Sequence, residues 1–170
     1  MIYPSLKDLR GLLSYDPASG MFTWLKKPNR NIVVGSNAGY TSKEGYVKVG
    51  INGKKLLAHR LAWLYMTGSL PDQSLDHING RRGDNRWVNL RLADIYQQAH
   101  NEGLRKSNST GRKGVYRSGS GYCASIRCRG SDVIHLGSFE SLDEAAHAYN
   151  KAAIRFHGDF ARLNPIGDEP

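Results

Sequence analysis

A polar, glycine-bearing stretch near residue 110 divides the chain into two segments that must each build a core of their own. The stretch RKSNSTGRKG spans residues 105–114 and shows no apolar periodicity, which is typical of a linker. Segments of about 50 to 60 residues can just sustain an independent core. We therefore predict a first module over residues 1–104, a linker at 105–111 and a second module over 112–164.

Basic residues outnumber acidic ones along the whole chain. In 170 residues there are 24 Lys and Arg against 15 Asp and Glu, a formal net charge of +9. The densest basic run covers residues 102–117. An excess of this size favours a polyanionic partner such as nucleic acid over a small-molecule substrate.

The cysteines and the apolar runs exclude several classes of protein. Cys123 and Cys128 are an odd number of positions apart, so a strand would point them to opposite faces, and we expect no disulfide. Two thiols without a CxxC pair cannot form a zinc ribbon. No apolar run is long enough to span a membrane. We therefore expect a cytoplasmic protein with no membrane partner.

The first module begins with helical and strand patterns in alternation. Residues 5–14 (SLKDLRGLLS) predict a short amphipathic helix, and MFTWL at 21–25 predicts a strand. The runs GYVKVGI and KKLLAH flank Asn52 and Gly53, which predicts a β-hairpin. From His59 the pattern becomes helical until Gly68 ends it.

The centre of the chain predicts a β-β-α unit over about residues 74–104. SLDHING at 74–80 indicates a strand entering a turn, and WVNLRL at 87–92 indicates a return strand. ADIYQQAHNEGL then predicts a helix that extends to about Leu104. The whole chain is therefore of the α+β class.

Asp76 and His77 are the candidate chemical centre of this unit. An imidazole can take a proton from water near neutral pH, while a neighbouring carboxylate can hold a hard divalent cation against a phosphate. Adjacent residues of a regular strand face opposite ways, so a twist or an additional ligand is required. The alternative is that Asp76 caps a turn and His77 is a structural histidine.

The run DHINGRRGDNRWVNLR, with AHRLAW upstream, resembles the HNH endonuclease motif of phage and intron-encoded homing enzymes. The resemblance covers about residues 56–103 and implies a ββα-metal fold. It implies that His77 is the general base, that Asp76 is a metal ligand, and that Asn89 steadies the loop and the base.

Gln98 departs from the family pattern. The resemblance places a second metal ligand there, usually Asn or His, and a glutamine carbonyl lies one methylene further from the backbone. His100 or Asn101 could serve instead, or the enzyme could be weak or inactive. The sequence leaves these alternatives open.

Several further side chains near this motif are candidates for DNA contact. Guanidinium groups would bind phosphates on either side of a cut, and a solvated face is the competing interpretation. His59 is expected to pack or to contact a phosphate rather than to catalyse. The arginines concerned are Arg81, Arg82, Arg86 and Arg91.

The second module predicts three strands followed by one helix. Ser141 and Glu144 form a capping box at the start of the helix, and its apolar stripe is expected to extend to Phe156. Alternation in YCASIRCR puts Arg127 and Arg129 on the face opposite the helix. Ile134 would join the core beneath that face.

Residues 109–164 resemble the DNA-binding domain of plant ethylene-response factors, a domain also found fused to HNH endonucleases in phages. The resemblance rests on STGRKGVYR, YCASIR, IHLGSFESLDEAAHAYNKAA and HGDFARLN. It implies a three-stranded antiparallel sheet that enters the major groove of double-stranded DNA. The family's contact positions fall on Lys113, Tyr116, Arg127, Val133 and His135, and Tyr116, Val133 and His135 replace residues common in the plant domains.

The sequence therefore predicts a site-preferring, homing-type DNA endonuclease that uses magnesium or manganese. The resemblance implies a phage-encoded protein that acts in the host cell. The alternative is a sequence-specific DNA-binding protein that has lost or weakened its catalysis. The target sequence, the choice between a nick and a double-strand cut, and the oligomeric state are not predicted.

Overall fold

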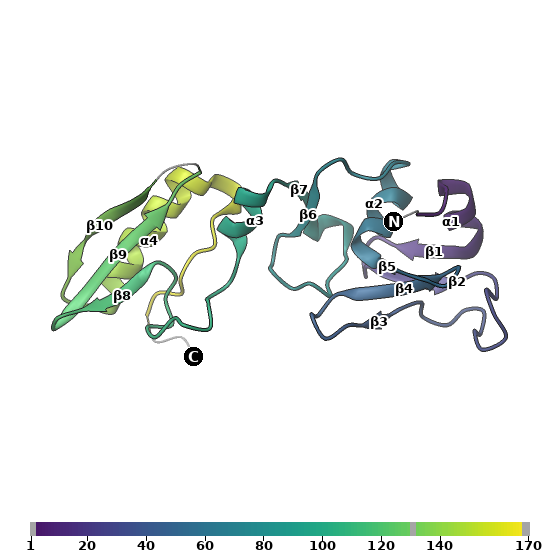
Figure 1. Cartoon of the computed structure of the whole chain (residues 1–170), viewed down its shortest axis with the longest axis horizontal. Coiled ribbons are helices and arrows are strands. Elements are labelled where there is room, and N and C mark those ends of the chain that lie inside the picture. The colour runs from purple at the N-terminus through teal and green to yellow at the C-terminus, as the bar shows by residue number, and fades with distance from the viewer. Residues whose placement is uncertain (1–2, 130–131, 168–170) are drawn as a thin grey trace. The chain divides into compact units, whose positions relative to one another are not determined.

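The structure is a computed structural model that describes residues 3–129 and 132–167, and it forms two compact units (Figure 1). The first unit is Met1–Asp94 and the second is Ile95–Pro170. The division falls before the stretch that the sequence predicts as a linker. Helices combine with small antiparallel sheets, which confirms the predicted α+β class.

The first unit contains two helices and three small sheets. β1 pairs with β2, β4 lies between β3 and β5, and β6 pairs with β7, all antiparallel. A 3₁₀ turn, η1, leads into β7. The elements are α1 (Leu6–Leu12), β1 (Leu13–Asp16), β2 (Met21–Trp24), β3 (Tyr40–Thr41), β4 (Val47–Ile51), β5 (Lys54–Leu57), α2 (Ala58–Thr67), β6 (Ser74–His77), η1 (Trp87–Asn89) and β7 (Leu90–Ala93).

Local sequence explains where these elements begin and end. Ser5 caps α1 by accepting a hydrogen bond from the Asp8 N–H. The predicted helix over 5–14 is too long, because Leu13 is fully buried and pairs with Trp24 in the first sheet. Asn52 has a positive φ of 51°, as a tight turn between β4 and β5 requires.

The core of the first unit lies between α1, α2 and the β1–β5 strands. Leu9, Leu13, Val49, Leu56 and Leu61 are almost completely buried there. Leu90 at the start of β7 packs against the same cluster. This contact attaches the β6–β7 ladder, which carries Asp76 and His77, to the main core of the unit.

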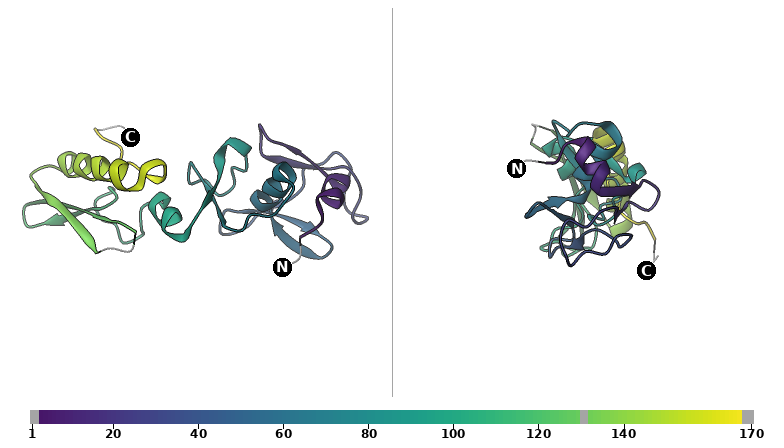
Figure 2. Two further views of the ribbon diagram at one scale, coloured as in Figure 1. Left: turned by 90° about the horizontal axis from the view of Figure 1, so that it is seen from above. Right: turned by 90° about the vertical axis from the view of Figure 1, so that its right-hand side faces the viewer.

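The second unit contains a three-stranded sheet in the order β10-β9-β8, with α4 along one face of it (Figures 1 and 2). The predicted capping box is present, since Ser141 and Glu144 exchange both hydrogen bonds. A short helix precedes the sheet. The elements are α3 (Ile95–Asn101), β8 (Val115–Ser118), β9 (Gly121–Arg127), β10 (Val133–Phe139), α4 (Leu142–His157) and η2 (Gly158–Phe160).

Two predictions about the core of the second unit are wrong. Phe156 is 42% exposed, and His157 takes the buried position at the end of α4. Ile134 is 38% exposed on the edge strand β10, although it pairs with the buried Ile126 of β9. No helix in the described residues has the length and apolar character needed to cross a membrane.

We predict that a fragment of residues 95–170 folds with a higher melting temperature than one of residues 107–170. The Lys113 Nζ donates to the carbonyl oxygens of His100 and Glu102 at 2.6 and 2.7 Å, and the rings of His100 and His157 stack at 3.7 Å. Losing these contacts should remove at least about 1 kcal/mol, or about 4–8 °C for a domain of this size. Thermal unfolding followed by circular dichroism measures the difference, and equal melting temperatures would contradict it.

Candidate functional site

Asp76 lies on β6 directly opposite Arg91 on β7. The strands pair regularly through this position, and the Nε and Nη2 of Arg91 donate to the Asp76 Oδ2 at 2.9 and 2.8 Å. Both side chains are largely buried. A pair of opposite charges at directly facing positions stabilises an antiparallel ladder. Arg91 is therefore engaged with the predicted metal ligand.

His77 is the last residue of β6 and is buried, with an exposed fraction of 5%. Its Nε2–H donates to the Asn85 Oδ1, 3.2 Å away. Burial lowers the pKa of His77, and the hydrogen bond to Asn85 opposes this effect. The ring is therefore neutral at neutral pH, with its lone pair on Nδ1.

Asn89 organises the loop that joins the two strands. Its Oδ1 accepts a hydrogen bond from the Asn79 N–H at 3.0 Å, and its Nδ2 donates to the Asp84 carbonyl oxygen at 2.8 Å. Asn79 donates in turn to the Asp84 carboxylate. Asn89 thus ties both ends of the loop together, while the amide that contacts His77 belongs to Asn85.

Asp84 forms an ion pair with Arg86 at 2.6 Å within this loop. The hydrogen bonds from Arg86 lower the pKa of Asp84, so its carboxylate is charged at neutral pH. Arg86 is accordingly engaged within its own loop, although its side chain remains about half exposed.

The β1–β2 hairpin supports the loop from the N-terminal side. The Tyr15 hydroxyl donates to the Asn85 carbonyl oxygen at 2.7 Å, and the Trp87 N–H donates to the Pro17 carbonyl oxygen at 3.0 Å. Gly20 has a φ of +75°, and a β-carbon there would collide with the backbone of Asn85. The N-terminal hairpin therefore fixes the residue that holds His77.

We predict that Tyr15→Phe destabilises the protein by about 1–3 kcal/mol. Tyr15 is buried, so losing its hydroxyl leaves the Asn85 carbonyl oxygen without this donor. Urea unfolding at neutral pH measures the change. Tyr40→Phe is a matched control, because Tyr40 is 47% exposed and should change stability by less than about 0.5 kcal/mol. Equal losses in both variants would contradict the support of the loop by Tyr15.

His59 and Tyr46 lie against His77 and complete an aromatic cluster. The His59 and His77 ring centroids are 5.1 Å apart in an edge-to-face arrangement, and Tyr46 lies 5.4 Å from His59. Burial lowers the pKa of His59 to about 3, with the neighbouring His77 and Arg60 adding to the effect. The His59 Nδ1 is buried and has no hydrogen-bond partner among the described residues. Nothing in the sequence pattern signals Tyr46, which precedes β4.

The remaining arginines of this region lie at the surface. Arg81 and Arg82 are exposed, and the Arg82 guanidinium lies 5.1 Å from the Tyr46 ring centroid. Arg82 also donates to the Glu44 carbonyl oxygen at 3.2 Å. Arg82 is thus placed next to the cluster that contains His77.

Gln98, His100 and Asn101 lie on α3, which belongs to the second unit. Asn101 is buried, and His100 stacks on His157 of α4. The assignment of a metal ligand among the three stays a prediction from the sequence. Among the described residues there is no cluster of three or more His, Cys, Asp or Glu that could hold a metal ion.

The sheet of the second unit presents a basic and aromatic outer face. Tyr116, Arg127, Val133 and His135 are all exposed. Arg129 is exposed as well, and its guanidinium lies 5.3 Å from the Tyr96 ring centroid.

Lys113 does not join the outer face of the sheet. It is only partly exposed, and its ammonium group points to the carbonyl oxygens at the end of α3. Burial lowers the pKa of Lys113 to about 8. Four of the five family contact positions are therefore exposed on the sheet, whereas the Lys113 ammonium group is held at the end of α3.

Sequence comparison identifies relatives for the segment that carries these residues. Residues 56–99 match the family described as HNH endonuclease. An uncharacterised HNH endonuclease of Acanthamoeba polyphaga mimivirus is 34% identical over 131 residues, which cover 75% of this chain and 66% of the relative. The chain thus spans slightly less than two thirds of that relative's length.

A solved structure of the HNH homing endonuclease I-HmuI, from work on DNA binding and cleavage, is 23% identical with a TM-score of 0.41. The match covers 55% of this chain and 53% of that one. The matched family segment contains Asp76, His77, Asn85 and Asn89. Residues 56–99 of this chain are thus similar in sequence to the HNH endonuclease family.

Proposed function

We propose that this protein is a DNA endonuclease that hydrolyses phosphodiester bonds with the help of a divalent metal ion. The observation that carries the proposal is the buried His77, held through Nε2 by Asn85 within the segment that matches the HNH endonuclease family. In this neutral form the Nδ1 lone pair is the group that takes a proton from water.

Asp76 fits a divalent metal ion by the chemistry of its donor. Magnesium is bound through one or two carboxylates together with water and substrate phosphates, so a cage of several protein carboxylates is not needed. Asp76 would hold the ion. Oxygen donors favour magnesium or manganese over zinc. The ion would supply charge stabilisation at the scissile phosphate.

The chain's own residues would position the DNA strand and the base. Asn89 and Asp84 keep the loop in place, and this loop carries Asn85 to the His77 ring. Arg91 lies against Asp76, where its guanidinium can also meet a phosphate. The exposed Arg81 and Arg82 would bind backbone phosphates on either side of the reacting one.

The second unit is proposed to read the DNA. Arg127, Arg129, Tyr116 and His135 on the exposed side of the sheet would contact the major groove and its phosphates. Lys113 would contribute to the positive potential rather than contact a base, since carbonyl oxygens occupy its donors. Cleavage would therefore be site-preferring, as in homing enzymes. A phage origin and action in the host cytoplasm stay expectations from the resemblance.

A second candidate function is a DNA-binding protein with weakened catalysis. Gln98 favours it, because the family usually has Asn or His at this position. The ion pair between Arg91 and Asp76 also favours it, since the guanidinium competes with a cation for the carboxylate. Both observations concern metal binding and leave the DNA-reading surface unchanged.

Incubation with supercoiled plasmid separates the two candidates. With magnesium or manganese present, an endonuclease converts the plasmid to open-circular or linear DNA, and chelation of the metal stops the conversion. A protein that shifts DNA in a gel but leaves the plasmid supercoiled at every metal concentration is the DNA-binding alternative. The products also show whether one or both strands are cut.

A further inference from the structure

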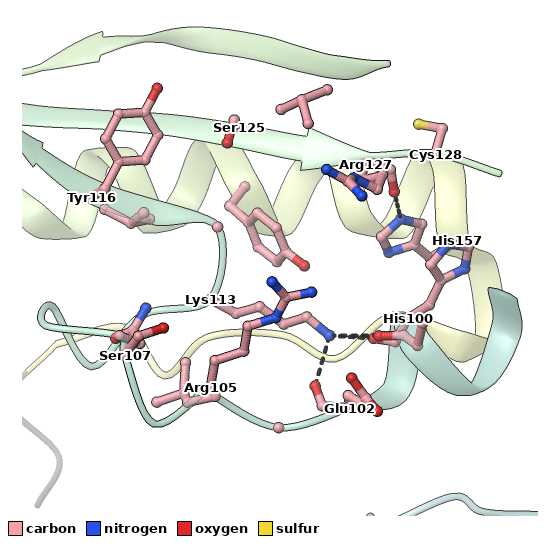
Figure 3. Close-up of a pocket in the computed structure, with 18 of the residues that line it drawn as sticks. His100, Glu102, Arg105, Ser107, Lys113, Tyr116, Ser125, Arg127, Cys128 and His157 are labelled. Atoms are coloured by element: carbon pink, nitrogen blue, oxygen red, sulfur yellow. Dashed lines mark hydrogen bonds between the residues drawn. The ribbon is translucent and has the colours of Figure 1, made fainter. Parts of the chain in front are cut away.

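A cavity of about 690 Å³ lies inside the second unit, between the segment 102–109 and the sheet (Figure 3). Residues of α3, β8, β9 and α4 complete its wall. Its volume falls in the range of small-molecule sites, which is about 300–1,000 Å³. Tyr116 and Arg127, which are proposed to read the groove, also line this cavity, but the proposed cleavage and groove reading assign no occupant to the cavity itself.

The wall of the cavity carries positive charge that is not neutralised. Arg105, Lys113 and Arg127 line it, and none of the three forms an ion pair within residues 3–129 and 132–167. Glu102 is the one acidic residue among the described residues of the wall. Burial disfavours a charged Lys113, repulsion from Arg162 and Arg105 adds to this effect, and Glu102 opposes it in part. An anion inside the cavity would relieve this repulsion.

The three cations have different roles toward such an anion. The ammonium group of Lys113 already donates to the His100 and Glu102 carbonyl oxygens, so it supplies charge rather than a direct contact. Figure 3 shows the Arg105 guanidinium directed into the cavity toward Lys113. Guanidinium groups bind phosphate with two parallel hydrogen bonds, so Arg105 and Arg127 suit a phosphate group.

His157 supplies a polar atom that has no partner. Its Nε2–H donates to the Arg127 carbonyl oxygen at 3.0 Å, so the Nδ1 of the neutral ring is an acceptor. This Nδ1 is buried and has no hydrogen-bond partner among the described residues, in a side chain that is 8% exposed. Buried acceptors are almost always hydrogen-bonded, so a ligand that donates a hydrogen bond to this Nδ1 would be stabilised.

Aromatic rings form the rest of the wall. Tyr116 and Tyr149 both line the cavity. Gly114 lets the chain pass close to the Tyr149 ring, because a β-carbon there would collide with it. Aromatic faces bind nucleobases by stacking and tolerate any base. The wall thus combines surfaces for a flat ring, a phosphate and a hydrogen-bond donor.

We propose that this cavity binds one nucleotide unit. Its phosphate lies between Arg105 and Arg127 in the positive field of Lys113, its base packs against Tyr116, and a base or sugar donor meets the His157 Nδ1. The unit comes from a free nucleoside monophosphate or from an unpaired nucleotide of a DNA strand. The proposal does not require that the protein cleaves DNA.

The test uses the full chain and three probes: deoxyadenosine monophosphate, deoxyadenosine and inorganic phosphate. Calorimetry should show that the monophosphate binds at least tenfold more tightly than either part alone. Backbone amide shifts in an NMR titration should concentrate at Ser107, Tyr116 and His157. Equal affinity for inorganic phosphate, no binding at millimolar concentration, or shifts confined to other residues would each overturn the proposal.

Two neighbouring variants make the test specific. Arg105→Gln should weaken binding of the monophosphate about tenfold, as expected for the loss of a hydrogen bond to a charged group. Lys106→Gln removes the same charge from the adjacent exposed residue, which does not line the cavity, and should change affinity less than twofold. Equal losses in the two variants would show a diffuse charge effect and overturn the proposal.

Competition distinguishes the two sources of the nucleotide. A duplex with one unpaired adenosine that displaces the monophosphate better than a fully paired duplex assigns the site to DNA. Displacement by neither duplex assigns it to a free nucleotide, and equal displacement by both overturns it. Plasmid cleavage by the same preparations reports the proposed nuclease function separately.

Discussion

His77→Ala is expected to lower metal-dependent plasmid cleavage by at least about 100-fold, the lower end of the range for loss of a general base. The methyl side chain cannot accept the proton that the imidazole would take from water. DNA affinity should change less than twofold, because His77 is buried and is not part of the exposed sheet of the second unit. Cleavage rate and gel-shift affinity measured on one preparation give both numbers.

Two further variants make this result specific to His77. His147→Ala removes an exposed histidine from α4 and should leave cleavage unchanged. Arg127→Ala should show the opposite pattern, with weaker binding and a smaller slope of affinity against salt, because one phosphate or base contact is lost. Cleavage by His77→Ala at the parent rate would exclude it as the general base.

The parts of the fold that the sequence predicts are those fixed by neighbours along the chain. The turn at Asn52 and Gly53 needs positive φ at both residues, and this requirement is visible in the sequence itself. The capping box of Ser141 and Glu144 is likewise a local exchange of two hydrogen bonds. Turns and helix caps of this kind can therefore be predicted from a few consecutive residues.

The parts that the sequence does not predict depend on contacts between distant residues. Tyr15 meets Asn85 across 70 positions, and no pattern around either residue indicates the pair. The one-residue shift between His135 and Gly137 of β10 depends on how two strands pair, and the periodicity within one strand does not show it. A sequence motif identifies the candidate site residues, but the residues that contact them can be identified only from the three-dimensional structure.

Lys113 illustrates the same limit within the candidate DNA-reading surface. A family position suggested a base or phosphate contact, yet the end of α3 supplies carbonyl oxygens that hold its ammonium group. Those oxygens belong to residues 11 and 13 positions earlier in the chain. Because α3 belongs to the same unit as Lys113, its carbonyl oxygens can hold the ammonium group. The direction of the Lys113 side chain therefore follows from tertiary contacts rather than from strand alternation.

Asp76→Asn is expected to raise the metal concentration needed for half-maximal cleavage by more than about tenfold. Loss of a residue that hydrogen-bonds to a metal ligand lowers metal affinity by about 10–100-fold. Since Asp76 is proposed as a ligand itself, its loss should lower metal affinity by at least a similar factor. The substitution also leaves Arg91 without the carboxylate that it contacts at 2.8 Å, so the variant should be less stable. The melting temperature of each variant should therefore be measured first, and cleavage should be assayed at a temperature where every variant is folded.

Arg91→Ala, compared with Asp76→Asn, separates a metal ligand from an ion-pair partner, because a metal ligand predicts that only Asp76→Asn raises the metal requirement. If Asp76 binds the metal, removing the guanidinium ends the competition for its carboxylate, and half-maximal cleavage should need the same or less metal than in the parent. The maximal rate should still fall, since a phosphate contact is lost. If Asp76 serves only to hold Arg91, both variants should lose cleavage equally with no change in metal requirement. That result would move the proposed metal ligand away from β6.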